Sequence, residues 1–141
     1  MSWNRVHFSS ATDQWETPSE VFGWASEKFG PLELDVCAGA SNTKCEHWIE
    51  ADSLGKDWDL PFWMNPPYGR GIGEWVKRAF ESSQYNRVIG VCLLPARTDT
   101  RWFHDYCTKG EVYFLRGRLK FGGAKNSAPF PSMIVVFGLA R

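Results

Sequence analysis

The sequence lacks the features that mark several specialised classes of protein. Its 16 Lys and Arg residues balance 16 Asp and Glu residues, so the formal net charge is zero, which argues against a broad, non-specific polyanion binder. No apolar run approaches the length of a membrane span, and the first ten residues lack the apolar segment of a signal peptide. We therefore expect a cytoplasmic protein with no membrane partner.

The four cysteines also lack the pattern of a metal site, because none stands in a C-x-x-C pair. Cys37, Cys45 and His47 lie near one another in the sequence, but their spacing matches no common zinc pattern. Cys37 and Cys92 stand inside apolar runs, where a buried, reduced thiol is the ordinary state in a cytoplasm. We expect no metal. A small metal-dependent protein using Cys37, Cys45 and His47 is kept as an alternative that metal analysis would test.

The chain is long enough for one domain with a real core, because it has 141 residues, of which 43% are hydrophobic. Aromatic residues make up 16% of it, including eight Trp, which is high for a chain of this size. Most of these rings are expected in the core, but surfaces on which bases stack are built from the same residues. We expect residues 1–14 to form a polar, flexible lead-in and residues 116–131 to form a loop insertion.

Short apolar runs alternate with amphipathic stretches along the chain. The apolar side chains of residues 72–80 recur with the period of a helix, whereas residues 87–94 read as a buried strand. Strands that alternate with helices predict an α/β fold with a mostly parallel sheet. The strands are expected at residues 32–37, 47–50, 61–64, 87–94, 111–115 and 132–139, with a tight turn at residues 38–41 that leads into a short helix.

Two other helices are predicted from their first residues. Thr17, Pro18 and Glu20 form a favourable start, in which Thr17 caps the helix and Glu20 completes a capping box. Thr98 or Asp99 is expected to cap a later, aromatic-rich helix. Because ligands of open α/β sheets bind beyond the carboxyl ends of the strands, the residues that follow the strands are candidates for a site.

Asn65, Pro66, Pro67 and Tyr68 follow the apolar residues 62–64 and form the most informative segment of the chain. The Asn65 side-chain oxygen and the Pro66 carbonyl can each accept one N–H of an exocyclic amine. Two acceptors bent toward one amine draw its nitrogen toward tetrahedral geometry, so its lone pair can attack a methyl donor. Tyr68 offers a ring face on which a flipped base can stack. A turn that merely ends a strand, the bland alternative, needs no such combination of residues.

A methyl donor needs a pocket of its own, and acidic residues near small ones are candidates for it. Asp35 ends a strand and precedes the small residues 38–40, where the backbone can approach a nucleoside closely. Glu50 and Asp52 follow the next strand, where a carboxylate can bind both hydroxyls of a ribose. The exposed helix start at Thr17 could hold the carboxylate of the donor's methionine portion. The structural alternatives are a turn carboxylate for Asp35, a solvated loop for Glu50 and Asp52, and a helix cap for Thr17.

Six segments, taken in order, carry a family resemblance: Asp13-x-Trp15-x-Thr17-Pro18, Leu34-Asp35-Val36-Cys37-Ala38, Asn65-Pro66-Pro67-Tyr68, Leu94-Pro95-Ala96-Arg97-Thr98-Asp99-Thr100, Gly117-Arg118-Leu119-Lys120-Phe121 and Pro131-Ser132. Together they resemble the phage-type DNA N6-adenine methyltransferases, the Dam-like family. The resemblance covers nearly the whole chain, from about residue 13 to residue 137. Asn-Pro-Pro-Tyr alone is shared with other amino-methyltransferases, so the joint set is far more specific.

The resemblance implies a compact Rossmann-like methyltransferase fold, S-adenosylmethionine as the donor and adenine N6 in DNA as the acceptor. The segment between Glu50 and Pro61 is short, so we expect one strand of the usual methyltransferase sheet to be missing. A phage-encoded enzyme of this kind would act in the host cytoplasm, and its oligomeric state is not predicted. The expected donor pocket comprises Trp15, Thr17, Pro18, Asp35, Ala38, Glu50 and Asp52.

Basic side chains that could bind DNA lie mostly after the Asn-Pro-Pro-Tyr segment. Arg97 and Arg101 follow a strand end on the expected active side, whereas Lys77 and Arg78 are better explained as the solvated face of a helix. Residues 116–131 are the only segment long enough to serve as a small recognition element. The candidate DNA contacts are Arg70, Arg97, Arg101, Arg118 and Lys120.

Other acceptors present the same planar amine, so methylation of RNA adenine, cytosine N4 or a protein Gln amide is also compatible with the segment. An inactive nucleic-acid-binding module of the same fold is a further alternative. Donor binding measured by calorimetry would separate an enzyme from such a module, and mass spectrometry of the methylated product would identify the acceptor.

Overall fold

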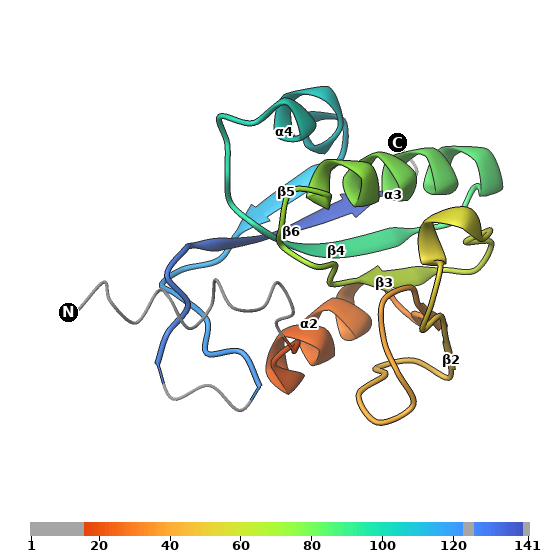
Figure 1. The fold of residues 1–141 in the computed structure, drawn as a ribbon, viewed down its shortest axis with the longest axis horizontal. Coiled ribbons are helices and arrows are strands. Elements are labelled where there is room, and N and C mark those ends of the chain that lie inside the picture. Colours follow the sequence, from red (N-terminus) through yellow and green to blue (C-terminus); the bar gives the residue numbers. More distant parts are fainter. Residues whose placement is uncertain (1–15, 123–125, 140–141) are drawn as a thin grey trace.

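The computed structural model describes residues 16–122 and 126–139. Its strands form one mixed six-stranded sheet in the order β2-β1-β3-β4-β6-β5 (Figure 1). β6 runs antiparallel to both of its neighbours, and the other strands share one direction. The predicted α/β fold with a mostly parallel sheet is confirmed. The strands are β1 (Leu34–Asp35), β2 (His47–Trp48), β3 (Phe62–Met64), β4 (Gly90–Pro95), β5 (Glu111–Phe114) and β6 (Ser132–Phe137).

Helices α2 (Ser19–Phe29) and α3 (Ile72–Asn86) cover opposite faces of the sheet (Figure 1). On the α2 face, Phe22 meets Trp63 of β3 edge-on, with ring centroids 5.3 Å apart. On the α3 face, Phe80 meets Phe137 of β6 at 5.7 Å. The remaining elements are the short helix α4 (Arg101–Asp105) and the 3-10 turns η2 (Ser53–Gly55) and η3 (Cys107–Lys109).

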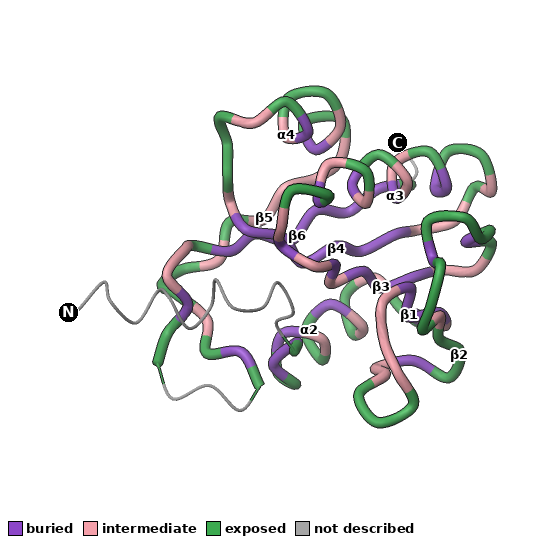
Figure 2. The backbone as a smooth tube through the Cα atoms, viewed as in Figure 1, coloured by how far each residue is buried: buried purple, intermediate pink, exposed green. Residues whose placement is uncertain are grey.

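The core is centred on β3, β4 and β6, in which every residue is buried (Figure 2). Strands covered on both faces are continuous apolar runs, which is why the sequence identified them. The packing is tight at Gly90, where an added Cβ would lie 2.1 Å from the Phe62 ring. A residue larger than glycine at this position would displace the aromatic ring of the neighbouring strand.

The polar residues of interest collect at one edge of the sheet. Asp35, Asn65 and Arg97 stand at or just after the carboxyl ends of β1, β3 and β4, which are parallel. β6 begins at the same edge, because its first residue, Ser132, pairs with Pro95 at the end of β4. The described residues between β5 and β6, 116–122 and 126–131, therefore also lie at this carboxyl edge.

Both predicted helix caps are wrong. Pro18 occupies the cap position of α2 without a capping side chain, because the Thr17 hydroxyl accepts hydrogen bonds from Trp63 and Asn65 instead. The cap of α4 is Thr100, whose hydroxyl accepts from the Phe103 backbone N–H, rather than either of the two preceding residues. In the first case the predicted capping side chain bonds to other residues, and in the second a neighbouring threonine takes the cap position.

Other differences concern boundaries. β1 has two residues instead of the expected six, and turns replace the short helix expected after residues 38–41, because side-chain oxygens of Asp35 and Asn42 bind the backbone there. β4 starts at Gly90, because Arg87 closes α3 in a left-handed conformation with φ of 56°. Residues 50–61 contain only the turn η2 and add no strand, as their small number led us to expect.

All four cysteines are free, which agrees with the expected reduced state. Cys92, Cys45 and Cys107 are buried, and burial raises the pKa of the last two to about 12. Cys37 is half-buried rather than buried. Within residues 16–122 and 126–139, no three His, Cys, Asp or Glu side chains are grouped so as to hold a metal ion. No helix in the same ranges is long and apolar enough to cross a membrane.

Candidate active site

Asn65 lies directly after β3 and is half-buried at the carboxyl edge. Its Nδ2 donates a hydrogen bond of 3.0 Å to the Thr17 hydroxyl, which also accepts one of 3.2 Å from Trp63 Nε1. Thr17 is only 7% exposed, so water competes little for these bonds. The Asn65 side chain is therefore tied to the start of α2 through the Thr17 hydroxyl.

The next residues carry the chain from β3 into α3. Pro66 is buried and Pro67 is half-buried, and their fixed φ angles restrict the backbone that follows Asn65. The Gly69 carbonyl accepts from the Ile72 backbone N–H and so leads into the first turn of α3. The segment predicted to hold an amine is thus anchored by a strand on one side and a helix on the other.

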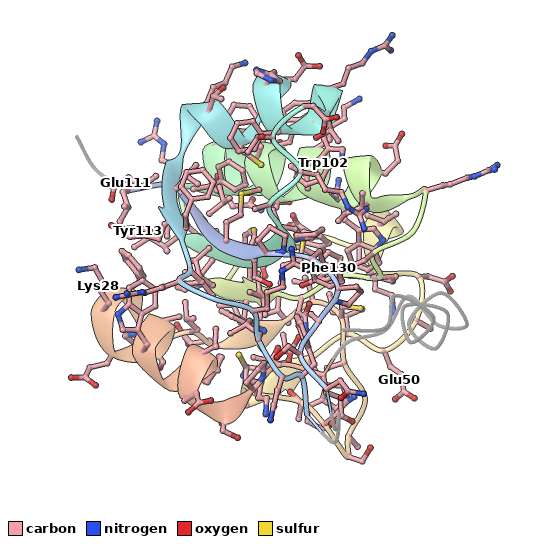
Figure 3. All side chains as sticks on the ribbon, turned by 90° about the vertical axis from the view of Figure 1, so that its left-hand side faces the viewer. Lys28, Glu50, Trp102, Glu111, Tyr113 and Phe130 are labelled. Atoms are coloured by element: carbon pink, nitrogen blue, oxygen red, sulfur yellow. The ribbon has the colours of Figure 1, made fainter. Side chains whose placement is uncertain are left out.

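Tyr68 is enclosed in this structure, with only 5% of its surface exposed. Its hydroxyl donates a 3.0 Å hydrogen bond to the Leu93 carbonyl of β4. Phe121 and Phe130 pack against its ring, with centroids 6.1 and 5.5 Å away, and Figure 3 shows Phe130 toward the middle of this side of the molecule. A base can stack on Tyr68 only after these neighbours shift.

The Tyr68 hydroxyl is also electrostatically linked to a basic residue of the carboxyl edge. Burial raises the pKa of the phenol well above 10, and the positive charge of Arg97 opposes part of that rise. Arg97 itself is exposed directly after β4. The arginine therefore stands near the buried tyrosine but faces solvent, where it can meet a polyanion.

Asp35 is 2% exposed and organises the turn that follows β1. One carboxylate oxygen accepts from the Cys37 backbone N–H at 3.3 Å, and the other accepts from the Lys44 backbone N–H at 3.0 Å. Desolvation raises its pKa from 3.8 to about 6, although both of these hydrogen bonds act in the opposite direction. The Asp35 side chain thus shapes the small-residue turn. This is the structural role that the sequence offered as an alternative to donor binding.

This buried carboxyl should make stability depend on pH. The native state holds the proton of Asp35 more tightly than the unfolded chain, so its stabilising effect is complete below about pH 4 and is lost as the pH rises through about 6. The difference corresponds to about 3 kcal/mol. We expect the free energy of unfolding of the wild type, relative to Asp35→Asn, to fall by about that amount between pH 4 and pH 7. Urea unfolding at a series of pH values measures it. A difference independent of pH would contradict the raised pKa.

Glu50 and the small-residue turn lie together. A Cβ added to Gly39 would be 3.6 Å from the Glu50 carboxylate, so the exposed acid lies directly over this turn. Figure 3 shows Glu50 projecting from the opposite side of the molecule to Lys28. Ala38 is half-buried in the same turn, and its backbone N–H bonds the Ile49 carbonyl. Asp52 is exposed in a left-handed conformation with φ of 56° and begins η2, so it has a structural explanation as a turn residue.

The start of α2 differs from the expected exposed helix end. Thr17 and Pro18 are both buried, and the first exposed side chains of the helix are those of Ser19 and Glu20. Thr17 nevertheless lies beside Asn65 through their hydrogen bond, so this segment belongs to the same site. Trp15 lies outside the described residues.

The comparisons with known proteins identify the family of this chain. A family described as "DNA N-6-adenine-methyltransferase (Dam)" matches residues 6–138. The chain belongs to this family. A protein of Haemophilus phage HP1 named "DNA N-6-adenine-methyltransferase" is 34% identical over 140 residues, covering 91% of this chain and 80% of its own length. The Escherichia coli K12 protein named "Putative methyltransferase YfdM" is 34% identical over 65 residues, covering 40% of this chain and 71% of its own.

Membership of the Dam family confirms three predictions from the sequence: the family resemblance, the Rossmann-like methyltransferase fold, and the assignment as a DNA N6-adenine methyltransferase. The six-stranded sheet with one antiparallel strand is the form that this fold takes here. The roles of individual residues rest on the geometry of the site alone.

Two parts of the site were not predicted from the sequence. Trp63 stands two residues before Asn65, and this spacing places both side chains on one face of a strand, which was an available signal. Phe121 and Phe130 reach Tyr68 from a distant segment, and no local pattern in the sequence indicates that contact. The two phenylalanines flank a stretch of small and polar residues. This is the only feature of the sequence which suggests that they pack against the rest of the protein.

The predicted DNA contacts Arg70, Arg97, Arg101, Arg118 and Lys120 are all exposed. Arg70 precedes α3, and Arg101 begins α4, which packs on α3 beside Gly73 through Trp102. Arg78 instead lies over the Trp58 ring at 5.9 Å and bonds the Lys56 carbonyl, so it has a structural role away from this edge. The basic residues that follow strand ends thus share the carboxyl edge with Asn65.

Proposed function

We propose that this Dam-family chain uses S-adenosylmethionine to methylate adenine N6 in DNA at the carboxyl edge, with Asn65 as the residue that orients the amine. The observation that carries the proposal is the place of Asn65, directly after β3 at the carboxyl edge, with its side chain bonded to the buried Thr17 hydroxyl. The side-chain oxygen of Asn65 would serve as one acceptor for the amine. The Pro66 carbonyl supplies a second acceptor from the same rigid turn.

The chemistry requires little more than positioning. The Asn65 side chain is neutral at ordinary pH, so it orients the amine and does not act as a base. With both amine hydrogens engaged, the nitrogen lone pair is turned out of the ring's π-system and toward the donor. The methylated amine then becomes acidic enough to lose a proton to water. Holding two reactants in line can supply about 7–11 kcal/mol of a barrier.

The residues for the donor fit S-adenosylmethionine. The turn after β1 is built from small residues and shaped by Asp35, and the exposed Glu50 carboxylate lies over Gly39, where it could bind ribose hydroxyls. The rest of the proposed pocket comprises Thr17, which is bonded to Asn65, together with Pro18, Ala38, Asp52 and Trp15. When bound, the donor supplies an electrophilic methyl group on a sulfonium.

The DNA surface is proposed to include Arg70, Arg97, Arg101, Arg118 and Lys120, with residues 116–131 influencing the choice of site. The target adenine must leave the duplex, because its amine is buried in the base stack. Tyr68 would then stack on the flipped base once Phe121 and Phe130 have moved from its ring. Both phenylalanines belong to residues 116–131, so entry of the base and DNA contacts of this segment would be linked.

The arginines give a quantitative prediction. Arg97→Gln or Arg101→Gln should weaken DNA binding and reduce the slope of log affinity against log salt by about one, because one phosphate contact is lost. Arg87→Gln is the matched control, since Arg87 is exposed before β4, at the opposite edge of the sheet. Titrations of labelled DNA at several salt concentrations measure the slopes. Equal slopes for all three variants and the wild type would move the DNA surface elsewhere.

Transfer of labelled methyl groups to unmethylated DNA, followed by nucleoside mass spectrometry, tests the proposed function directly. We expect N6-methyladenine as the product, with S-adenosylmethionine consumed in equal amount. Methylcytosine, or methylation confined to RNA or protein, would identify one of the alternative acceptors. Donor binding without any transfer would favour the inactive nucleic-acid-binding module.

A further inference from the structure

The hydroxyl of Ser132 is buried without a hydrogen-bond partner. Ser132 is the first residue of β6 and is 1% exposed, and within residues 16–122 and 126–139 nothing bonds its Oγ. Buried hydroxyls nearly always have a partner, because the bonds to water that they lose on burial must be replaced. Pro131-Ser132 also belongs to the family resemblance, yet the function proposed above gives it no role. This hydroxyl therefore needs an explanation that the fold does not supply.

The backbone around Ser132 fixes the place of its side chain. The Ser132 carbonyl accepts from the Leu115 backbone N–H, just beyond β5. On its other side, Ser132 is in register with Pro95, the last residue of β4. The neighbouring Pro131 carbonyl accepts from the Ala96 backbone N–H. Ser132 is thus held between the ends of two strands at the carboxyl edge.

Ser132 and Asn65 lie on the same face of the sheet. Side chains alternate between the two faces along a strand, and residues in register on neighbouring strands share a face. Trp63, which packs on α2, is in register with Val91, and Val91 is in register with Val136. Asn65 stands two residues after Trp63, and Ser132 stands four residues before Val136. Both side chains therefore point to the α2 side of the carboxyl edge.

The strand between these two residues carries the ring on which a base is proposed to stack. Neighbouring strands lie about 4.8 Å apart, so Ser132 on β6 and Asn65 after β3 stand about 10 Å apart across the strands. Tyr68 is bonded between them, to the Leu93 carbonyl of β4. A purine that makes one hydrogen bond at its amine and another at its ring edge spans such a gap. Phe130, whose ring must leave Tyr68 before a base enters, precedes Ser132 by two residues, so the same shift opens the way to the hydroxyl.

We propose that Ser132 binds the flipped adenine, with its hydroxyl hydrogen-bonded to a ring nitrogen while Asn65 holds the amine. The inference rests on the proposed function and adds a base-binding residue outside the Asn-Pro-Pro-Tyr segment. Apart from its amine, the adenine ring offers only acceptor nitrogens, so the hydroxyl donates to the base. The hydroxyl has no partner until the base arrives, which lowers the stability of the free protein in favour of substrate binding.

Ser132→Ala separates a binding role from a structural one. The variant loses no hydrogen bond in the free protein, so the midpoint of its urea unfolding should equal or exceed that of the wild type. The kcat/KM for DNA should fall about tenfold, because a ring nitrogen of the bound base is left unpaired. Donor affinity measured by calorimetry should change less than about twofold.

Ser53→Ala is the matched control. Within the described part of the chain, Ser53 also has a buried hydroxyl without a partner. Its carbonyl accepts from Trp58, whose ring stacks on Trp75 of α3, so Ser53 belongs to the opposite face of the sheet. We expect the kcat/KM of this variant to match that of the wild type.

Deaza analogues of adenine test the contact at the level of single atoms. A duplex that the wild type methylates is prepared with 1-, 3- or 7-deazaadenine as the target base, so that one ring nitrogen becomes C–H. One analogue should lower kcat/KM about tenfold more for the wild type than for Ser132→Ala. Any effect of the analogue on the reactivity of the amine is common to both enzymes and cancels from this ratio.

The outcomes separate this inference from the function on which it rests. If the wild type and Ser132→Ala respond alike to all three analogues, the hydroxyl does not touch the base and the inference is wrong. An unchanged kcat/KM with a lower unfolding midpoint in Ser132→Ala would likewise assign the hydroxyl to the fold alone. Neither result affects adenine methylation itself, whereas a wild-type protein that transfers no methyl group to adenine would defeat the proposed function.

Discussion

Asn65→Ala should reduce methyl transfer by at least about 100-fold while leaving donor affinity close to that of the wild type. The loss is of the size seen when one pre-organised polar group is removed from the reacting centre. Donor binding should persist, because the small-residue turn and Glu50 follow β1 and β2, whereas Asn65 follows the neighbouring strand β3. Transfer to DNA and calorimetric binding of the donor are the two measurements.

Asn65→Asp is the informative control for this prediction. An aspartate keeps an oxygen for the amine, and the Thr17 hydroxyl can donate to the other carboxylate oxygen while it still accepts from Trp63. We therefore expect this variant to retain activity. Equal transfer by the alanine variant and the wild type would show that Asn65 does not orient the amine.

Tyr68→Ala should lose both stability and transfer. The ring is enclosed against Phe121 and Phe130, so its removal leaves a cavity and costs about 3–5 kcal/mol in the free energy of unfolding. It also removes a stacking surface worth about 1–3 kcal/mol per base. Urea unfolding and transfer, assayed at a temperature where the variant is folded, separate the two effects.

Tyr68→Phe isolates the hydroxyl from the ring. The variant loses only the hydrogen bond to the Leu93 carbonyl, which is worth about 1 kcal/mol of stability. Because the ring face carries the proposed role, transfer should stay near the wild-type rate. A loss as large as that in Tyr68→Ala would show that the hydroxyl, and not the ring, matters for the reaction.

The sequence predicted the parts of the fold that depend on local patterns. β3, β4 and β6 are covered on both faces, so their apolar runs are continuous, and α3 shows the helical period because one face packs on the sheet. The carboxyl edge followed from the parallel arrangement, which placed Asp35 and Asn65 at equivalent strand ends. These features need no knowledge of distant contacts.

The rest depends on which of several partners a side chain finds. Thr17 has the right chemistry for a helix cap and for an acceptor beneath Asn65, and only the packing of α2 on β3 decides between them. The short strands β1 and β2 hold two residues each, too few to give a pattern. The contacts of Phe121 and Phe130 with Tyr68 join residues more than 50 positions apart, beyond the reach of local periodicity.

The antiparallel direction of β6 has a consequence for how this enzyme can diversify. The connection from β5 both leaves and re-enters the sheet at the carboxyl edge, and backbone bonds from Leu115 to Ser132 and from Ala96 to Pro131 close its base. Lengthening a loop with fixed ends costs little, about 0.6 kcal/mol for each doubling. Insertions into this connection could thus be tried without repacking the core, so new target sequences could evolve on an unchanged catalytic frame.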